Sequence, residues 1–285
     1  MKRIFVCAAT PKDKAQRSVR QGDEVVKTMV AREQFKTTGF VLRTLSYSES
    51  DLIVTFYSHD FGKLKGIAKG AKRSKKRFVN VFEPFSLTDI IFTRKSRDTL
   101  AFIDSCEIID HYHAIRQDME KTLIASYFID LTDHFSPEGK KNEKIFQLLQ
   151  DFLLVLGRDR TSDAIVRFFE MRLLKLAGFE PAIDRCIVCK TPVANGNAYY
   201  FHPGEGGIKC GACAKVQRYE QPISAGTVRT LLLGKDMDID KIKLVSLTDS
   251  LAKESRSILI GFISHVLGKE VKSLKVMEQV RKFCT

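Results

Sequence analysis

Hydrophobic and polar residues alternate in short runs over the first part of the chain, between Thr37 and about residue 110. The runs are rich in Val, Ile, Phe, Tyr and Thr and are separated by turn signals such as HDFG and KSRD, a pattern typical of β-strands. Five strands are predicted, in FVLRTLS, DLIVTFYS, KLKGIAKG, FSLTDIIFT and TLAFIDSCEII. Five strands in a segment of this length fit a small barrel such as an OB-fold, although strand count alone does not exclude an SH3-like barrel.

The periodicity becomes helical after His111. In DMEKTLIASYFIDLTDHF the apolar residues recur near a 3.6-residue spacing, and SPEG ends the pattern. Further helices are predicted in NEKIFQLLQDFLLVLG, in SDAIVRFFEMRLLKLAG, and over residues 224–233 and 250–267. We therefore expect an α+β protein in which a five-stranded OB-type barrel, residues 37–110, precedes an all-α domain, residues 111–285.

Four of the seven cysteines form two closely spaced pairs within an insert at residues 183–215, namely Cys186, Cys189, Cys210 and Cys213. Two CxxC turns joined by a chain with hairpin signals supply the four thiolates of a tetrahedral Zn²⁺ site. Four protein ligands leave no position for water, so the predicted zinc site is structural rather than catalytic. The alternatives are four unrelated cysteines, or a redox CxxC that would need no second pair.

Basic residues exceed acidic residues by 47 to 34, and the resulting net charge of +13 favours nucleic acid or an anionic lipid surface as partner. Within residues 36–110 the numbers are 13 basic and 9 acidic, but outside residues 63–77 they are 5 and 9. The positive charge of the predicted barrel is therefore concentrated in KLKGIAKGAKRSKKRF, residues 63–78, which we call the basic segment.

Period-two alternation in KLKGIAKG places Lys63, Lys65 and Lys69 on one face of a strand, and AKRSKKR predicts a connecting loop. Cations on a strand and its loop form a track for a phosphate backbone. Because most of them are lysines, which act as point charges, base-specific readout is not predicted. The candidate DNA-binding residues are Arg43, Lys63, Lys65, Lys69, Lys72, Arg73, Lys75, Lys76 and Arg77.

Two other interpretations of the basic segment stay open, a solvated basic loop and a localisation-type cluster. Phe56, Tyr57 and Phe61 could extend the track with rings for base stacking. However, an aromatic residue in a short strand more often belongs to the core.

Sequence motifs for nucleotide binding or hydrolysis are absent: the chain contains no GxxxxGK[ST], GxGxxG, HExxH or GxSxG. Asp130, Asp133 and His134 could suggest a metal cluster, but their spacing is more simply the polar face of an amphipathic helix. No apolar run reaches about 18 residues, so no membrane helix is predicted and a cytosolic protein is expected. Residues 1–36 are predicted to be a flexible basic extension, or an artefact of a start site upstream of Met29.

The chain resembles the bacterial RecO recombination mediators in two segments. The first is TTGFVLRTLSYSESDLIVTFYSHDFGKLKGIAKGAKRSKKRF with the following FEPFSLTDI. The second comprises RFFEMRLLKLAGFEPAIDRCIVC and FHPGEGGIKCGACA, which resemble the family's helical and zinc-binding region. The resemblance extends over about residues 37–233, and residues 1–35 depart from it because family members usually begin near Thr37.

The resemblance implies a non-enzymatic DNA repair protein of the bacterial cytoplasm, associated with the nucleoid. Such proteins bind single- and double-stranded DNA, anneal complementary strands, and act with RecR to load RecA onto DNA coated by single-strand-binding protein. They also bind the acidic C-terminal tail of that protein through the helical domain. Two other functional classes compete with this expectation, a metal-dependent nucleic-acid-processing enzyme with a structural zinc ribbon, and a pure interaction scaffold.

Overall fold

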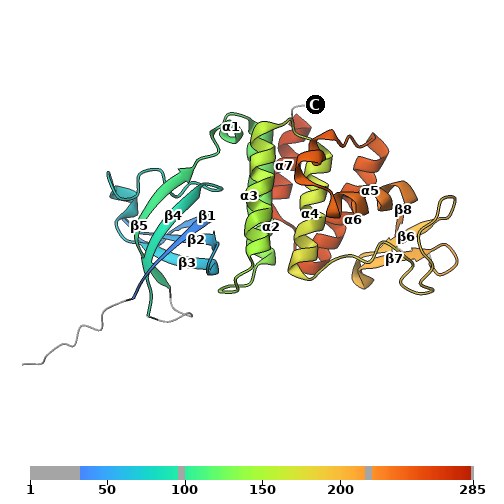
Figure 1. Ribbon diagram of the computed structural model, residues 1–285, viewed down its shortest axis with the longest axis horizontal. Coiled ribbons are helices and arrows are strands. Elements are labelled where there is room, and N and C mark those ends of the chain that lie inside the picture. Colours follow the sequence, from blue (N-terminus) through green and yellow to red (C-terminus); the bar gives the residue numbers. More distant parts are fainter. Residues whose placement is uncertain (1–32, 96–99, 216–219, 284–285) are drawn as a thin grey trace, which may run out of the picture. The chain divides into compact units, whose positions relative to one another are not determined.

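The computed structural model describes residues 33–95, 100–215 and 220–283, which belong to one compact unit (Figure 1). The predicted extension over residues 1–36 lies almost entirely outside them, and the first strand already begins at Gln34. All five predicted barrel strands are present. They are β1 (Gln34–Ser46), β2 (Leu52–Ser58), β3 (Gly62–Ala68), β4 (Leu87–Thr93) and β5 (Ala101–Asp110).

The five strands close into a barrel in the order β1-β2-β3-β5-β4, with β4 pairing back onto β1. Only β3 and β5 run parallel, through Gly66↔Ala101 and Ile67↔Phe102. Alternate residues of the strands point into the closed barrel and form its core, among them the fully buried Phe56 and Phe92. The order and closure confirm the predicted OB-type barrel.

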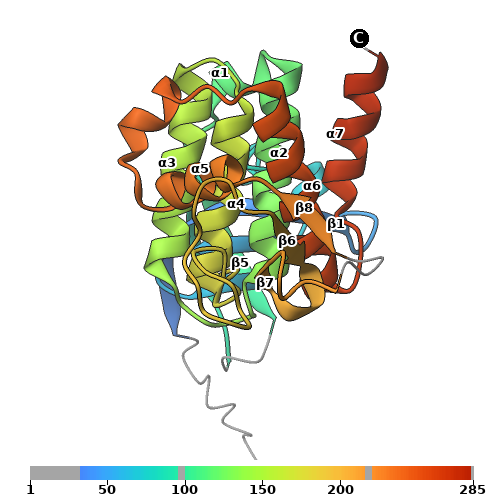
Figure 2. The same cartoon turned by 90° about the vertical axis from the view of Figure 1, so that its right-hand side faces the viewer.

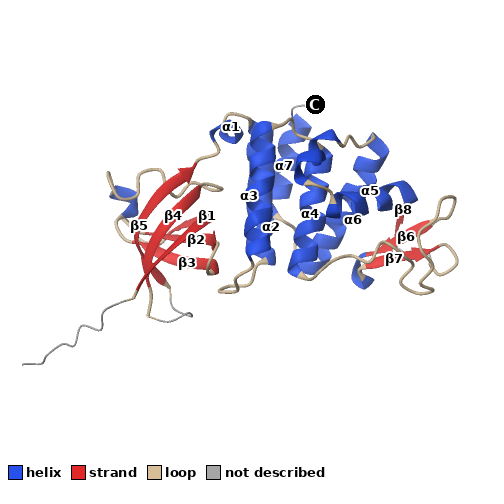
Figure 3. Cartoon of the chain, viewed as in Figure 1, coloured by secondary structure: helices blue, strands red, loops and turns tan. Residues whose placement is uncertain are grey.

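The second part of the chain is helical (Figure 3). Its helices are α1 (His113–Arg116), α2 (Met119–Phe135), α3 (Glu143–Arg158), α4 (Asp163–Ala177), α5 (Ala225–Asp236), α6 (Asp249–Leu267) and α7 (Lys272–Phe283). The predicted limits of α4 are confirmed, because Ser162 caps its first turn and Gly178 ends it with a φ of 85°. Helices α1 and α7 were not predicted; α7 packs beside α2 (Figure 2).

Aromatic rings and one buried ionic network fill the core of the helical part. Phe128 stacks on Phe169 with ring centroids 3.9 Å apart. Arg167 and Glu170 are almost fully buried, their nearest charged atoms are 2.9 Å apart, and the Tyr127 hydroxyl donates a 2.7 Å hydrogen bond to Glu170. Burial raises the pKa of the Glu170 carboxyl. This network joins α2 to α4 and fixes their relative positions.

The cysteine insert, which lies between α4 and α5 in the sequence, forms a second, small sheet at one end of the helical part (Figure 3). Its strands are β6 (Tyr199–His202), β7 (Gly207–Cys210) and β8 (Gln221–Ile223), in the order β7-β6-β8. Fully buried Phe201 packs against Phe262 of α6 with ring centroids 5.6 Å apart, so the insert is anchored on the helical core.

The barrel contacts the helical part through β1, β2 and the start of β3. Phe40 packs on Phe146 with centroids 5.0 Å apart, and the Tyr57 hydroxyl donates a 3.1 Å hydrogen bond to the carbonyl of Asn142. Gly62 has a φ of 65°, and a Cβ there would lie 2.0 Å from the Lys140 carbonyl oxygen. Only glycine allows the two backbones to approach this closely.

Candidate nucleic-acid interface and cysteine cluster

The basic segment occupies β3, a short 3-10 turn (Ala71–Arg73) and the loop that follows. Leu64 and Ala68 point into the barrel core, so Lys63 and Lys65, on either side of Leu64, point outward. Gly66 lies on the inner side, where a Cβ would approach the Ile103 side chain to 2.3 Å. The predicted alternation of cationic and small residues along this strand is therefore present in the structure.

Lys63 lies at the contact with α2 rather than in open solvent. Its side chain is only 15% exposed, and its Nζ donates to the Asp133 backbone carbonyl at 2.6 Å and to the Asp133 carboxylate at 3.1 Å. Arg43 of β1 approaches the other carboxylate oxygen of Asp133, at 3.7 Å, and its own side chain is largely exposed. Asp133 thus neutralises one of the nine predicted DNA-binding cations and partly neutralises a second.

Lys65 is engaged by the loop between α2 and α3. Its Nζ donates a 2.8 Å hydrogen bond to Glu138, and the Gly139 backbone N–H donates to the Lys63 carbonyl at 3.0 Å. This loop therefore pairs with the half of β3 that β5 leaves unpaired. The first two lysines of the basic segment contribute to the contact between barrel and helices.

Asp130 and His134 belong to the same contact between the barrel and α2, which we call the junction. They lie beside a cavity of about 490 Å³ that Arg43 also lines. Asp130 accepts hydrogen bonds from the Ser273 hydroxyl at 2.7 Å and its backbone N–H at 3.2 Å, which caps the first turn of α7. His134 Nε2 lies 3.3 Å from Asp130, and burial lowers its pKa. The polar face of α2 thus bridges the barrel and α7, and within the described residues it forms no metal-type cluster.

The remaining cations of the basic segment project from the end of β3 and the following loop. Lys69 holds its amine 5.4 Å from the Phe102 ring centre, and Arg77 donates a 2.7 Å hydrogen bond to the Lys69 carbonyl. Lys75 and Lys76 are exposed, and in the described part of the chain neither forms an ion pair. Their charges are available to an anionic partner.

The loop is held against the turn between β1 and β2. The Asp51 carboxylate accepts a 2.8 Å hydrogen bond from the Gly70 N–H, which lowers the pKa of Asp51. Lys72 donates from its backbone to the Ser50 carbonyl at 3.0 Å, and Arg73 lies 3.4 Å from Glu49. The β1–β2 turn therefore gives the cation-bearing loop after β3 a defined backbone conformation.

The aromatic candidates for stacking are mostly internal. Phe56 is fully buried in the barrel, and Tyr57 is fully buried against the helices, so neither offers a ring to a ligand. Phe61 is partly buried among Phe35 and Phe92, at one end of the barrel. These positions agree with the interpretation that aromatic residues in short strands belong to the core.

Tyr47, in the β1–β2 turn, has an exposed ring with 62% of its surface accessible, and it is not among the residues predicted to bind DNA. A signal was available in the sequence, because in SYSES the tyrosine stands among polar turn residues rather than inside a strand pattern.

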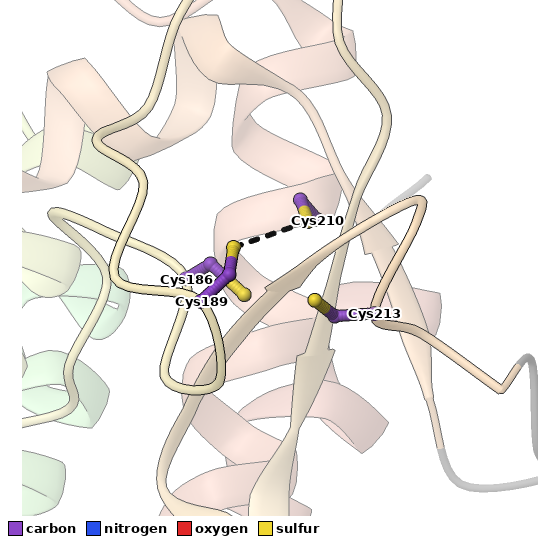
Figure 4. A group of neighbouring side chains, drawn as sticks. All are labelled: Cys186, Cys189, Cys210 and Cys213. Atoms are coloured by element: carbon purple, nitrogen blue, oxygen red, sulfur yellow. Dashed lines mark hydrogen bonds between the residues drawn. The ribbon is translucent and has the colours of Figure 1, made fainter.

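The four paired cysteines come together, as predicted (Figure 4). Cys186 and Cys189 lie in the turn after α4, whereas Cys210 ends β7 and Cys213 follows it. The ligand atoms all lie within 4.8 Å of one another, and the Cys189 and Cys210 sulfurs are 3.7 Å apart. A metal ion with bonds of about 2.3 Å to four thiolates would separate its sulfurs by about 3.8 Å, so the cluster fits such an ion.

Local hydrogen bonds favour the thiolate form on one side of the cluster. The Thr191 side chain, with its backbone N–H, lowers the pKa of the Cys189 thiol to about 6. Contact with Cys210 and Cys189 raises the pKa of Cys213 to about 12. Four neighbouring thiols cannot all ionise without a cation to offset their mutual repulsion, so this donor set is suited to hold a metal ion.

Two family models match consecutive parts of the chain. The model "Recombination protein O N terminal" matches residues 29–112, and "Recombination protein O C terminal" matches residues 116–275. The chain belongs to the RecO family. RecO relatives cover nearly the whole chain: the DNA repair protein RecO of Syntrophus aciditrophicus is 48% identical over 256 residues, 89% of this chain and 99% of the relative.

More distant RecO proteins align over a similar length. The DNA repair protein RecO of Anaeromyxobacter sp. (strain K) is 31% identical over 87% of this chain and 97% of its own, and that of Halalkalibacterium halodurans is 28% identical over 86% and 94%. Membership of the RecO family supports a role in DNA repair and recombination. No helix in the described ranges is long and apolar enough to cross a membrane.

Proposed function

We propose that this RecO-family chain is a DNA-binding recombination mediator without catalytic activity. It binds single- and double-stranded DNA without sequence specificity through the barrel and anneals complementary strands. The observation that carries the proposal is the exposed cationic loop, where Lys75 and Lys76 form no ion pair with any described residue and Lys72, Arg73 and Arg77 remain exposed. Phosphate neutralisation by such side chains supplies sequence-independent affinity.

In this proposal the DNA-binding domain is the barrel, residues 37–110. The helical domain, residues 111–285, binds zinc through its insert at residues 183–215. The partners are RecR and the acidic C-terminal tail of single-strand-binding protein, and through them RecA is loaded onto single strands. These steps place the protein in the bacterial cytoplasm at the nucleoid. The support for these partners and this location is membership of the RecO family.

The function is tested by a strand-annealing assay with and without single-strand-binding protein, using the full chain. We expect annealing without nucleotide and without cleavage of either strand. Degradation of DNA that depends on Mg²⁺ would instead indicate a nucleic-acid-processing enzyme. In the described residues the one group of metal-ligating side chains is the set of four cysteines, which leaves no open coordination position for such chemistry.

The DNA surface is tested by replacing Lys72, Arg73, Lys75 and Lys76 with glutamine. Loss of up to four phosphate contacts should lower the affinity and reduce the slope of log K against log[salt] by up to about 3 for single strands. Because these side chains are exposed, the urea midpoint should not change. An unchanged affinity and salt slope would refute the proposed surface.

The metal in the cysteine cluster is proposed to be a structural Zn²⁺ ion. Replacing Cys189 with alanine should release zinc and lower the melting temperature, because binding free energy at such a site stabilises the fold. Cys106, which is buried in the barrel core, provides the control: Cys106→Ala should retain zinc even if it loses stability. A Cys189→Ala protein with full zinc content would contradict the assignment.

A further inference from the structure

The four sulfurs of the cysteine cluster differ in their access to solvent. Cys186 is completely buried, whereas Cys210 and Cys213 are half-buried. Cys189 is exposed, and so is its neighbour Val188, which has 57% of its surface accessible. Both belong to the turn that follows α4. A reagent that approaches the cluster from solvent therefore meets Cys189 first.

The Cys189 sulfur faces a cysteine from another segment of the insert. It lies 3.7 Å from the sulfur of Cys210, the last residue of β7 (Figure 4). A disulfide needs sulfurs about 2.05 Å apart, so the two must approach each other by less than about 2 Å. Because Cys189 lies in an exposed turn rather than in a helix or strand, its segment can make this adjustment.

Cys186, which shares the CxxC turn with Cys189, is held in place more firmly. Its backbone N–H donates a 2.9 Å hydrogen bond to the Thr191 carbonyl, and its carbonyl accepts one of 2.9 Å from the Lys190 N–H. These bonds and its complete burial fix the Cys186 sulfur. Cys210 is therefore the better partner for a disulfide with Cys189.

The chemistry of hydroperoxides fits this arrangement. The thiolate is the nucleophilic form of cysteine, and a thiol that coordinates a metal ion is deprotonated. The Cys189 sulfur attacks one oxygen of the hydroperoxide, the O–O bond breaks, and the other oxygen takes up a proton and leaves as an alcohol or water. The Cys210 thiolate then attacks the sulfenic acid at Cys189, and the S–O bond breaks with release of water. Two thiolates lose two electrons, the hydroperoxide accepts them, and two protons are consumed.

We propose that Cys189 is a site of oxidation by hydroperoxides, and that its disulfide with Cys210 removes two of the four ligands of the metal site. The inference rests on the proposed zinc site and deepens it by assigning a covalent modification to it. Only Cys186 and Cys213 remain as thiols, whereas a structural zinc site needs four ligands. Oxidation therefore releases the metal, and a thiol reductant restores the four thiols and with them the site.

Contacts outside the cluster keep the effect of the oxidation local. Phe201 anchors the insert on Phe262 of α6, and the Ile187 N–H donates a 2.8 Å hydrogen bond to the Ile208 carbonyl of β7. The CxxC turn thus stays attached to β7 when the metal leaves. Cys106, in the barrel core, is 3% exposed and is protected from the same reagent. The modification therefore acts on the insert and leaves the barrel unchanged.

The test uses the full chain with zinc bound. Cys7 and Cys284, which lie outside the described residues, are replaced by serine, so that only Cys106 and the cluster carry thiols; this protein is the parent. Hydrogen peroxide is added, free zinc is followed with a coloured chelator, and the alkylated products are mapped by mass spectrometry. We expect zinc release together with a peptide pair joined through Cys189 and Cys210. Dithiothreitol should reverse both changes.

Two histidine variants of the parent give a matched comparison. Cys189→His and Cys213→His each leave three cysteines and one histidine, a set that also binds zinc. Cys189→His should release zinc at least about tenfold more slowly than the parent because the reacting sulfur is gone, whereas Cys213→His should stay within about twofold of the parent. Zinc content is measured before treatment. If either variant binds no zinc, the parent decides, because its Cys189 and Cys210 should be the first thiols to resist alkylation.

The outcomes separate this inference from the proposed function. Equal zinc release from Cys189→His and the parent, a first disulfide that does not join Cys189 to Cys210, or zinc that stays bound in peroxide would overturn the oxidation site while the zinc assignment stands. A parent protein that binds no zinc before treatment would refute the zinc assignment and the oxidation site with it. Strand annealing by the untreated protein tests the proposed DNA function separately.

Discussion

The two halves of one basic segment differ in what their charges do. Lys63 and Lys65, on β3, are bonded to Asp133 and Glu138 and join the barrel to the helical part. Lys75 and Lys76, about ten residues further on, are exposed and without an ion pair among the described residues. Similar side chains in one run thus act as structural cations in the first half and as available cations in the second. The number of charges in a segment therefore does not measure how much charge is available for binding.

Replacing a lysine in the first half of the basic segment should have the greatest effect, on the stability of the fold. Replacing Lys63 with methionine leaves Asp133, whose side chain is 12% exposed, without its closest cation and removes a hydrogen bond to the Asp133 carbonyl. We expect a loss of about 2–3 kcal/mol in the free energy of unfolding by urea denaturation. Lys75→Met is the matched control and should change stability by less than about 0.5 kcal/mol. Equal stability of the two variants would show that Lys63 stabilises the fold no more than Lys75 does.

The next effect concerns DNA affinity, for which we expect the second half of the basic segment to matter more than the first. Lys75→Gln with Lys76→Gln should weaken single-strand binding about tenfold at 0.1 M salt and reduce the salt slope by about 1.4. Lys63→Gln with Lys65→Gln removes the same charge but should weaken binding less, since both lysines are already paired. Anisotropy titrations at several salt concentrations compare the two. A larger loss from the first-half pair would show that the junction also contacts DNA.

One contribution to the pH dependence of stability is expected where the barrel meets α2. Burial lowers the pKa of His134, whose ring also faces Asp130, Asp133, Lys63 and Lys269. The unfolded chain therefore takes up the proton more readily, so stability is retained above the unfolded histidine pKa of about 6.5 and declines as the pH falls below it. Urea midpoints of the wild type at pH 8 and pH 5.5 should reveal the decline, and His134→Asn should reduce it. An identical pH profile in His134→Asn would exclude His134 as the cause.

The smallest effect should come from Glu49, which lies 3.4 Å from Arg73 in the exposed half. Removing its charge in Glu49→Gln frees Arg73 for phosphate, and single-strand affinity should increase about two- to threefold because exposed ion pairs are weak. Asp104→Asn, on β5, gives the same change in net charge away from Arg73 and serves as the control. An equal increase in both variants would indicate long-range attraction only.

Much of the fold could be predicted from local patterns. The five strands and the segments of α2 to α6 carry clear periods of two and 3.6 residues, and Ser162 and Gly178 mark the ends of α4 by their backbone chemistry. The cysteine cluster was also predicted, because spacing and turn residues near each CxxC are local properties. Helix α7 was missed: its composition is mainly polar, and its start is capped by Asp130 from α2, far away in sequence.

The candidate DNA surface was predictable only in part. Alternation along KLKGIAKG correctly predicts that the lysines point away from the barrel core. It does not tell whether they then meet the helical part of the chain or solvent. Helix α2 engages the Lys63 side chain and the α2–α3 loop engages Lys65, and nothing near these lysines in the sequence indicates either contact.

The sequence by itself determined the class of each element, the closed set of four thiols and the concentration of positive charge in one segment. These are properties of neighbouring residues, and backbone geometry converts them directly into strands, turns and ligand spacing. The tertiary structure decided which of the cations remain available, because Asp133 and Glu138 reach Lys63 and Lys65 only through the packing of α2 against the barrel. Contacts between residues about 70 positions apart depend on how whole elements pack, so the periodicity of the local sequence does not predict them.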